Sequence, residues 1–426
     1  MKHQIILRPA RHQQRGAAAL IVTILLFIAM ALVAIFVNRN LVFEQRASAN
    51  QYRATQAFEA AEAGAEWALA QLDNPQRIGP DCLPSDDSAA SSFRSRYLSH
   101  AGAAFVPATW SSGGVASVLQ PSCVRSNTGW ACSCPQNGHP VLDEPSGVGP
   151  FPAFTLQFAA GDKPGSIRVQ ATGCTRLTGA CVPGSASSLD AVARVDVTLG
   201  LLPGLRTPPA AALTARGSVD ADSAAFGAHN TDPATGLAIH AGASLAASQA
   251  RLTLPAGAPL ASALVGNDTS LADLSPEQLF VSYFGLDKTR WKNQTTVQRV
   301  TCSVDCGAVL RAAVAATDGS ALLWVDGDLA IDGPVTLGSA EHPVVIVVAG
   351  SARLRGAVGL HGLLYATTLR WDDTTTPGAA LRGAAISESN YAGNATADFI
   401  RDAGVLTALQ NHSGSFVRIN GGWRDF

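Results

Sequence analysis

The chain has 426 residues, of which 47% are hydrophobic and only 15% are charged, and its formal net charge is −2. This length allows two or three domains, and the hydrophobic content is too high for an intrinsically disordered chain. The near-neutral balance excludes a strongly basic protein, so we expect no nucleic-acid partner.

An uninterrupted apolar segment lies near the N-terminus. Residues 17–37 read AAALIVTILLFIAMALVAIFV and carry no charge. The leader before it, residues 1–16, contains the basic side chains Lys2, Arg8, Arg11 and Arg15. An apolar run of this length spans a bilayer as a helix. Because basic residues stay on the cytoplasmic side, the sequence predicts a single-pass inner-membrane protein with a periplasmic C-terminal part.

Other interpretations of this segment remain open at this point. A cleaved secretory signal has a shorter apolar core, of about 7–15 residues, followed by a small-residue cleavage site. An ordinary membrane anchor has the same hydropathy as a processed one. The basic leader meets the apolar helix directly at Gly16, with no polar spacer. This junction leaves room for a third, specially processed class.

The helix is expected to continue beyond the membrane. Residues 41–72 are rich in Ala, Glu, Gln, Leu and Arg, which favour helices. A narrow apolar stripe at three- and four-residue steps consists of Phe58, Ala61, Ala65, Leu69 and Leu72. Pro75 pushes Asn74 out of the α region and ends the helix. The sequence therefore predicts one long helix within residues 17–74, with residues 17–37 as its transmembrane half.

Three short motifs accompany this helix. Gln14-Arg15-Gly16 precedes the apolar run, Glu44 and Arg46 follow it, and AFEAAEAG occupies residues 57–64. Together they resemble the N-terminal domain of PilX-type minor pilins of type IV pili, over about residues 10–75. The resemblance implies cleavage by prepilin peptidase after Gly16, methylation of Ala17 and packing of the helix into a pilus. The candidate assembly residues are Leu20, Ile21, Phe27, Glu44, Arg46, Phe58, Glu59 and Glu62.

One position departs from the pilin pattern. Major pilins carry a glutamate at the fifth position after the cut, and Ile21 stands there in this chain. The resemblance implies that this glutamate pairs with the N-terminal amine of a neighbouring subunit, because an unpaired buried carboxylate is costly. A subunit without it would suit the first position at a fibre tip. The capping pseudopilin of type II secretion also lacks it and is an alternative identity. An anchored envelope protein that never enters a fibre is another.

All eight cysteines follow the apolar segment: Cys82, Cys123, Cys132, Cys134, Cys174, Cys181, Cys302 and Cys306. Because the exported compartment is oxidising, the sequence predicts disulfides, and no CxxC pair or histidine cluster favours zinc. Short loops favour the pairs Cys174–Cys181 and Cys302–Cys306. Cys132 and Cys134 are too close to bond each other, so each is expected to reach outward, toward Cys82 and Cys123. The connectivity stays open at this point.

Residues 75–205 are predicted to form a disulfide-containing α+β region of pilin type. Residues 154–158, 166–171 and 191–199 alternate apolar and polar positions, which is typical of strands. The resemblance implies that such strands form an antiparallel sheet packed on the helix. The segment PGLRTPP, residues 203–209, marks a domain boundary.

A repeat characterises the C-terminal part, residues 210–426. Residues 325–337 align with 348–360 at a step of 23, with glycines coinciding, and residues 381–386 echo 354–357 at a step of 27. Residues 217–239 offer an earlier, more degenerate copy. Short strands separated by glycine at such a period predict a β-solenoid-like domain, with a β-sandwich as the alternative. Residues 411–426 are expected to cap it, with Trp423 and Phe426 over the last rung.

Catalytic signatures are absent from the sequence. It contains no HExxH, GxSxG or Walker-type motif, and VDGDLAIDG does not match a calcium loop. We therefore expect no enzyme, metal site or cofactor. The predicted fold class is α+β: a long N-terminal transmembrane pilin helix, a small antiparallel β region and a Gly-rich solenoid-like domain. Expected partners are other minor and major pilins, the inner-membrane assembly platform, prepilin peptidase and a large tip adhesin.

Overall fold

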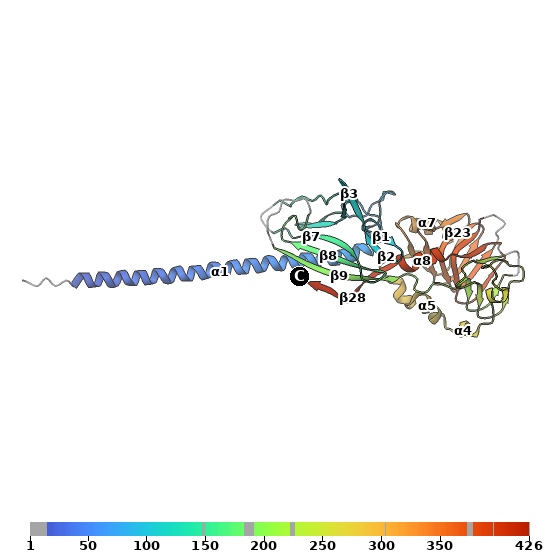
Figure 1. The fold of residues 1–426 in the computed structure, drawn as a ribbon. Coiled ribbons are helices and arrows are strands. Elements are labelled where there is room, and N and C mark those ends of the chain that lie inside the picture. Colours follow the sequence, from blue (N-terminus) through green and yellow to red (C-terminus); the bar gives the residue numbers. More distant parts are fainter. Residues whose placement is uncertain are drawn as a thin grey trace, which may run out of the picture. The chain divides into compact units, whose positions relative to one another are not determined.

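The computed structural model describes residues 15–146, 150–182, 191–221, 226–302, 304–372, 378–394 and 396–425. The chain divides into two compact units, Met1–Gln56 and Ala57–Phe426. The described part of the first unit belongs to helix α1 (Arg15–Leu72), whose last turns lie in the second unit. Within these described residues, all strands belong to the second unit (Figure 1). The predicted α+β class, with a long N-terminal helix and a large β-rich region, is confirmed.

The long helix ends where the sequence predicts. Helix α1 stops at Leu72, just before Asn74-Pro75. In the second unit one face of α1 is buried and consists of small residues, namely Ala57, Ala60, Ala61, Gly64, Ala65 and Ala68. Small side chains let the helix approach a sheet closely. A Cβ atom added at Gly173 would lie 2.0 Å from the Ala57 carbonyl oxygen, so only glycine fits there.

The sheet against this face is antiparallel and has the order β28-β9-β8-β7-β5-β6. Its strands are β5 (Ser122–Ser126), β6 (Gly129–Ser133), β7 (Ala153–Ala160), β8 (Ser166–Cys174), β9 (Val192–Pro203) and β28 (Gly414–Asp425). The three strands predicted in residues 154–199 are β7, β8 and β9, and they pair with one another in that order. We call this sheet, with residues 57–134 around it, the antiparallel lobe.

Smaller elements complete the antiparallel lobe. They are helix α2 (Phe93–Tyr97), the hairpin β1 (Leu98–Ala101) and β2 (Ala104–Pro107), and the hairpin β3 (Thr109–Ser112) and β4 (Val115–Val118). Three disulfides lie in this lobe: Cys82–Cys134, Cys123–Cys132 and Cys174–Cys181. The fourth, Cys302–Cys306, lies outside it. The structure therefore contains both short-loop pairs that the sequence favours, and it assigns Cys82 and Cys123 as the partners of Cys134 and Cys132.

The remaining strands form two sheets in which every described pair is parallel, and we call them the parallel stack. The larger sheet contains β10 (Ala211–Ala215), β12 (Gly227–Asn230), β13 (Leu237–Ala241), β15 (Arg251–Thr253), β16 (Leu264–Val265), β17 (Val297–Thr301), β18 (Ala321–Asp326), β20 (Val335–Leu337), β21 (Val344–Val348), β23 (Val358–Ala366), β25 (Ala380–Ser387) and β27 (Asp398–Arg401). The smaller sheet contains β11 (Val219–Asp220), β14 (Leu245–Ala246), β19 (Leu329–Asp332), β22 (Ser351–Arg355), β24 (Thr368–Asp372) and β26 (Tyr391–Gly393). Pairs such as Leu329↔Ala352 and Val335↔Val358 have the 23-residue step of the sequence repeat.

Both faces of the larger parallel sheet are buried. Side chains such as Leu323, Ile346 and Leu364 face the core shared with the smaller sheet. The other face is covered by α5 (Pro276–Phe284), α6 (Lys288–Lys292) and α8 (Ala403–His412), with Phe280, Phe284 and Trp291 in contact with it. Burial on both faces explains the continuous apolar run VVIVV in β21. Short helices α3 (Leu260–Ala263), α4 (Thr269–Ala272) and α7 (Gly307–Ala315) complete the stack.

The order of strands in the stack does not follow the order in the sequence. β10 lies between β13 and β25, so the first strand of the stack pairs with one near its end. The chain then passes through β13 and β16, continues through the helices α4, α5 and α6, and re-enters the larger sheet at β17. From β17 it proceeds through β18, β21, β23 and β25 back to β10. The stack is therefore inserted between β9 and β28, which pair with each other.

Two details of the sequence analysis are wrong. Leu381 pairs with Leu360, and Gly383 with Gly362, so the third copy is not in register with residues 354–357. The C-terminal segment does not cap the parallel stack: β28 returns to the antiparallel sheet, and Trp423 contacts Phe58 of α1 there. Phe426 lies outside the described residues. β28 pairs with β9 over residues 414–418 and again over residues 423–425, and these ladder hydrogen bonds favour its place in the antiparallel sheet. That the stack is a solenoid as a whole stays a prediction.

Candidate functional site

The first candidate surface is the N-terminal part of α1. From residue 18 to residue 55 every side chain is exposed except the half-buried Ala31. Leu20 is 61% exposed, Ile21 58% and Phe27 74%. From Ala18 onward α1 is long and apolar enough to cross a membrane. So much contiguous apolar surface is unfavourable in water, so this segment requires lipid or other helices around it.

The predicted assembly residues lie along this one helix and do not converge on a pocket. Gly16 is exposed, with open space where a side chain would be, and the side chain of Ala17 is outside the described residues. Glu44, Arg46, Glu59 and Glu62 are exposed as well. Phe58 is half-buried and meets the Trp423 ring edge-on, with ring centroids 6.3 Å apart. The roles of these residues in processing and assembly stay predictions.

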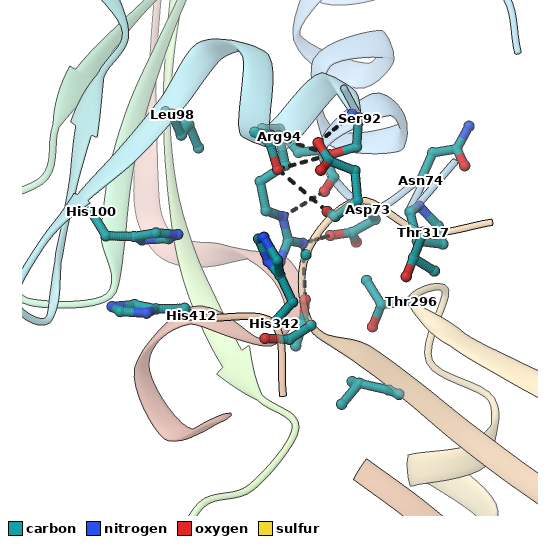
Figure 2. A pocket seen from close by; sticks show the side chains of 18 of the residues that line it. Asp73, Asn74, Ser92, Arg94, Leu98, His100, Thr296, Thr317, His342 and His412 are labelled. Carbon is teal, nitrogen blue, oxygen red and sulfur yellow. Dashed lines mark hydrogen bonds and ion pairs between the residues drawn. The ribbon is translucent and has the colours of Figure 1, made fainter. Parts of the chain in front are cut away.

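The second candidate is a polar junction where α1 ends, within the second unit (Figure 2). Asp73 is buried there and holds three separate segments. Its Oδ1 accepts hydrogen bonds from the Phe416 backbone N–H, at 2.7 Å, and from Arg94, at 3.3 Å. Its Oδ2 accepts one from the Thr295 hydroxyl, at 3.0 Å. One carboxylate therefore connects α1 with α2, with β28 and with the loop that leads into the parallel stack.

Arg94 completes this junction from α2. Its guanidinium donates to the carbonyl oxygens of Leu72 and Gly414, each at 2.9 Å, and lies 4.8 Å from the centroid of the Phe416 ring. Burial lowers the pKa of Arg94 to about 10, although the Asp73 carboxylate acts in the opposite direction. Burial likewise raises the pKa of Asp73 against its hydrogen bonds and the Arg94 charge. Arg94 nonetheless stays charged at neutral pH and compensates the buried carboxylate.

A cavity of about 270 Å³ lies beside this pair. Its lining comes from both lobes and includes Ser92, Arg94, Ser95, His100, Thr296, Thr317, Asp318, Glu341, His342 and His412. The Asp318 carboxylate accepts the Ser92 backbone N–H at 2.9 Å, which joins the parallel stack to the start of α2. The cavity is therefore a gap in a polar contact between the antiparallel lobe and the parallel stack.

Two histidines stack at the edge of this cavity. The rings of His100 and His412 have centroids 3.9 Å apart and are tilted by 20°. His412 Nε2 donates to the Gly102 carbonyl oxygen at 2.8 Å. Burial, followed by the nearby His412 and Arg94, lowers the pKa of His100 to about 4. At neutral pH His100 is therefore uncharged, and the two rings lie face to face without repulsion.

The junction consists of polar contacts that connect the two lobes. Among the described residues, no group of three His, Cys, Asp or Glu side chains could hold a metal ion. The polar groups around Asp73 bind one another and connect segments that are far apart in the chain. Asp73 and Arg94 are not among the predicted site residues, because Asn74-Pro75 was interpreted only as the end of a helix. A charged residue just before a helix stop was the available signal.

Comparison with known proteins bears on the first candidate. Residues 15–66 match the family model described as PilX N-terminal, which confirms the predicted resemblance over these residues. No curated protein matches the chain. A solved structure, the competence-associated pilin ComZ from Thermus thermophilus, matches with 12% sequence identity over 88% of this chain and 97% of that one, at a TM-score of 0.24.

Proposed function

We propose that this chain is a pilin-type structural subunit that is anchored by the N-terminal part of α1 and then transferred into a type IV pilus. The observation that carries the proposal is the exposed apolar helix, which coincides with the match to the PilX N-terminal model. In a fibre, other pilin helices would replace lipid around this segment. The second unit would then be displayed on the fibre surface.

The proposal includes processing and topology. The basic leader would stay in the cytoplasm and prepilin peptidase would cut after Gly16, leaving a methylated Ala17 as the new N-terminus. Residues beyond the membrane would fold in the periplasm, where the four disulfides form. The inner-membrane assembly platform and other minor and major pilins would be the partners, with a structural rather than catalytic role throughout.

Ile21 supports a place near the tip, in the priming of assembly. A pilin inside the fibre would leave the N-terminal amine of its neighbour unpaired if it lacked the glutamate at this position. The first subunit would not incur this cost. A capping subunit of a type II secretion pseudopilus would meet the same condition and is the second candidate.

The test is the mature N-terminus, determined by mass spectrometry in cells with and without prepilin peptidase. The proposal predicts a methylated Ala17 that disappears when the peptidase is deleted, and recovery of the protein in sheared fibres. An intact leader in both strains would overturn it in favour of an anchored envelope protein. If Ala17 is the mature N-terminus, deleting the pilus genes and the type II secretion genes separately decides between a pilus and a pseudopilus.

A further inference from the structure

The two ends of the parallel stack differ in how their terminal strands are covered. At one end the terminal strands β17, β19 and β20 all contact α7. Leu310 of α7 is fully buried, and the Cys306 backbone N–H donates to the Ala330 carbonyl oxygen of β19 at 2.8 Å. Helix α7 therefore covers this end, which we call the capped end, and protects its strand edges from solvent.

The opposite end, formed by β14, β15 and β16, is covered less completely. Each of these strands has one described neighbour, which is β11, β12 and β13 respectively. Val219 of β11 is 1% exposed and Ala228 of β12 is fully buried. Their register partners in the terminal strands, Leu245 and Leu252, are only half-buried. Positions that the core of the stack buries are therefore partly exposed at this end.

The side chains at this end are apolar and almost free of charge. We define the open end as five leucines: Leu245, Leu252, Leu254, Leu260 and Leu264. Four of them are half-buried, and Leu260 is 58% exposed. Residues 242–265 contain one charged residue, Arg251, which forms an ion pair with Asp398 at 2.6 Å. Sheet edges that remain in water are usually protected by charges. An uncharged apolar edge of this kind indicates a contact with protein.

A second copy of this chain fits these properties. A two-fold axis brings the same patch of two copies together, and a patch with a net charge would then repel its own copy. The open end avoids this repulsion, because its one charge is already paired. A two-fold axis across the end also reverses the strand direction. It thereby brings the free edge of β15 in one copy beside that of β16 in the other, for antiparallel pairing.

We propose that the open end is the contact between two copies of this chain, related by a two-fold axis across that end. The contact covers the five leucines of each copy and gives the terminal strands a partner on their second side. All of these residues belong to the second unit. The inference therefore goes beyond the proposed function and does not depend on processing or on packing of α1.

Charged substitutions at the open end of the full-length chain test the pair. The acidic variant is L245E/L260E and the basic variant is L245K/L260K. The matched control is V309E, because Val309 lies on α7 at the capped end and is 44% exposed. The single variants L260E and L260K change only an exposed side chain. They keep the test decisive if a charge at the half-buried Leu245 impairs folding.

Hydrogen exchange reports the contact locally. The purified chain in detergent is compared at about 1 μM and about 100 μM, a range that brackets a contact with a micromolar Kd. In the unsubstituted chain and in V309E, peptides from residues 244–265 should exchange about fivefold or more slowly at the higher concentration, because a covered strand edge opens less often. Peptides from α7 should show no such change. Exchange in β10 and β25 at the unsubstituted rate shows that a variant is folded.

The acidic and basic variants should each lose the concentration dependence, because like charges then face one another in the pair. An equimolar mixture of the two should regain it, since opposite charges meet. Concentration-independent exchange in the unsubstituted chain, or no recovery in a mixture of folded variants, overturns the inference. The mature N-terminus of the same preparation tests the proposed function separately. Either result can therefore fail while the other holds.

Discussion

The antiparallel lobe and the parallel stack are both β-rich, but they are held together in different ways. The antiparallel lobe packs its sheet on α1 and contains three disulfides. The parallel stack buries its apolar side chains between its own sheets and contains one disulfide, across a short loop. The antiparallel lobe depends on disulfides and on packing against a helix. The parallel stack depends on the close pairing of neighbouring strands. Each lobe should therefore fail for a different reason.

Disturbing the close pairing of neighbouring strands should have the largest effect on stability, and this effect should be confined to the parallel stack. Gly362 in β23 has a φ of +147°, and a Cβ atom there would lie 1.8 Å from the Val344 carbonyl oxygen. We expect Gly362→Ala to destabilise the stack by about 4 kcal/mol, through strain and loss of the β21–β23 pairing. Hydrogen exchange, followed on peptides from each lobe, measures this.

Gly359 in the same strand is the matched control. A Cβ atom at Gly359 would meet Thr336 Oγ1 at 3.4 Å, which is close to ordinary contact. Gly359→Ala should therefore cost less than about 1 kcal/mol. If Gly362→Ala speeds hydrogen exchange equally in both lobes, the lobes unfold as one unit. That result would contradict the proposed difference between the antiparallel lobe and the parallel stack.

Removing disulfides should act mainly on the antiparallel lobe. Cys82–Cys134 spans 52 residues and Cys302–Cys306 spans four. Loop-closure entropy then gives about 4 kcal/mol for the first and about 2 kcal/mol for the second. We expect Cys82→Ala/Cys134→Ala to lower the urea midpoint of the antiparallel lobe more than Cys302→Ala/Cys306→Ala lowers that of the stack. Midpoints that fall by the same amount would show that the stack depends on its disulfide just as strongly.

The same contrast explains how far the sequence could predict the fold. The end of α1, strands β7 to β9 and the short disulfide loops have local signals, and the 23-residue step appears as repeated glycines. The pairings of β10 with β25 and of β9 with β28 have no local signal in the sequence. Their partners lie far apart in the chain, and any apolar strand would fit the alternating pattern. The Asp73 junction depends on those long-range pairings. The charge of Asp73 beside the helix stop was a local signal, but its partners Phe416 and Thr295 could not be found before β28 was known to return.

Removing the charge of Asp73 at the junction between the two lobes should have an intermediate effect on stability. In Asp73→Asn the shape of the side chain is kept, but the Arg94 charge loses its buried partner. We expect a loss of about 2 kcal/mol, with faster hydrogen exchange at the start of β28 and around Thr295. Asp86→Asn, at an exposed position of the same lobe, is the control and should change little. Unchanged exchange in Asp73→Asn would mean that the lobes hold together without this carboxylate.

Protonation of His100, at the edge of the same junction, should have the smallest effect on stability. Burial beside His412 and Arg94 lowers the pKa of His100 to about 4, from about 6.5 in the unfolded chain. Between these values the unfolded chain binds a proton that the folded chain does not, so stability falls as the pH falls from about 6.5 to about 4. His100 keeps more than a third of its surface exposed, so solvent screening limits the loss to about 1 kcal/mol or less.

Phenylalanine at position 100 keeps the stacking on His412 and cannot be protonated. His100→Phe should therefore flatten the pH dependence of the unfolding midpoint in this window. An unchanged slope in His100→Phe would contradict the assignment of this pH dependence to His100.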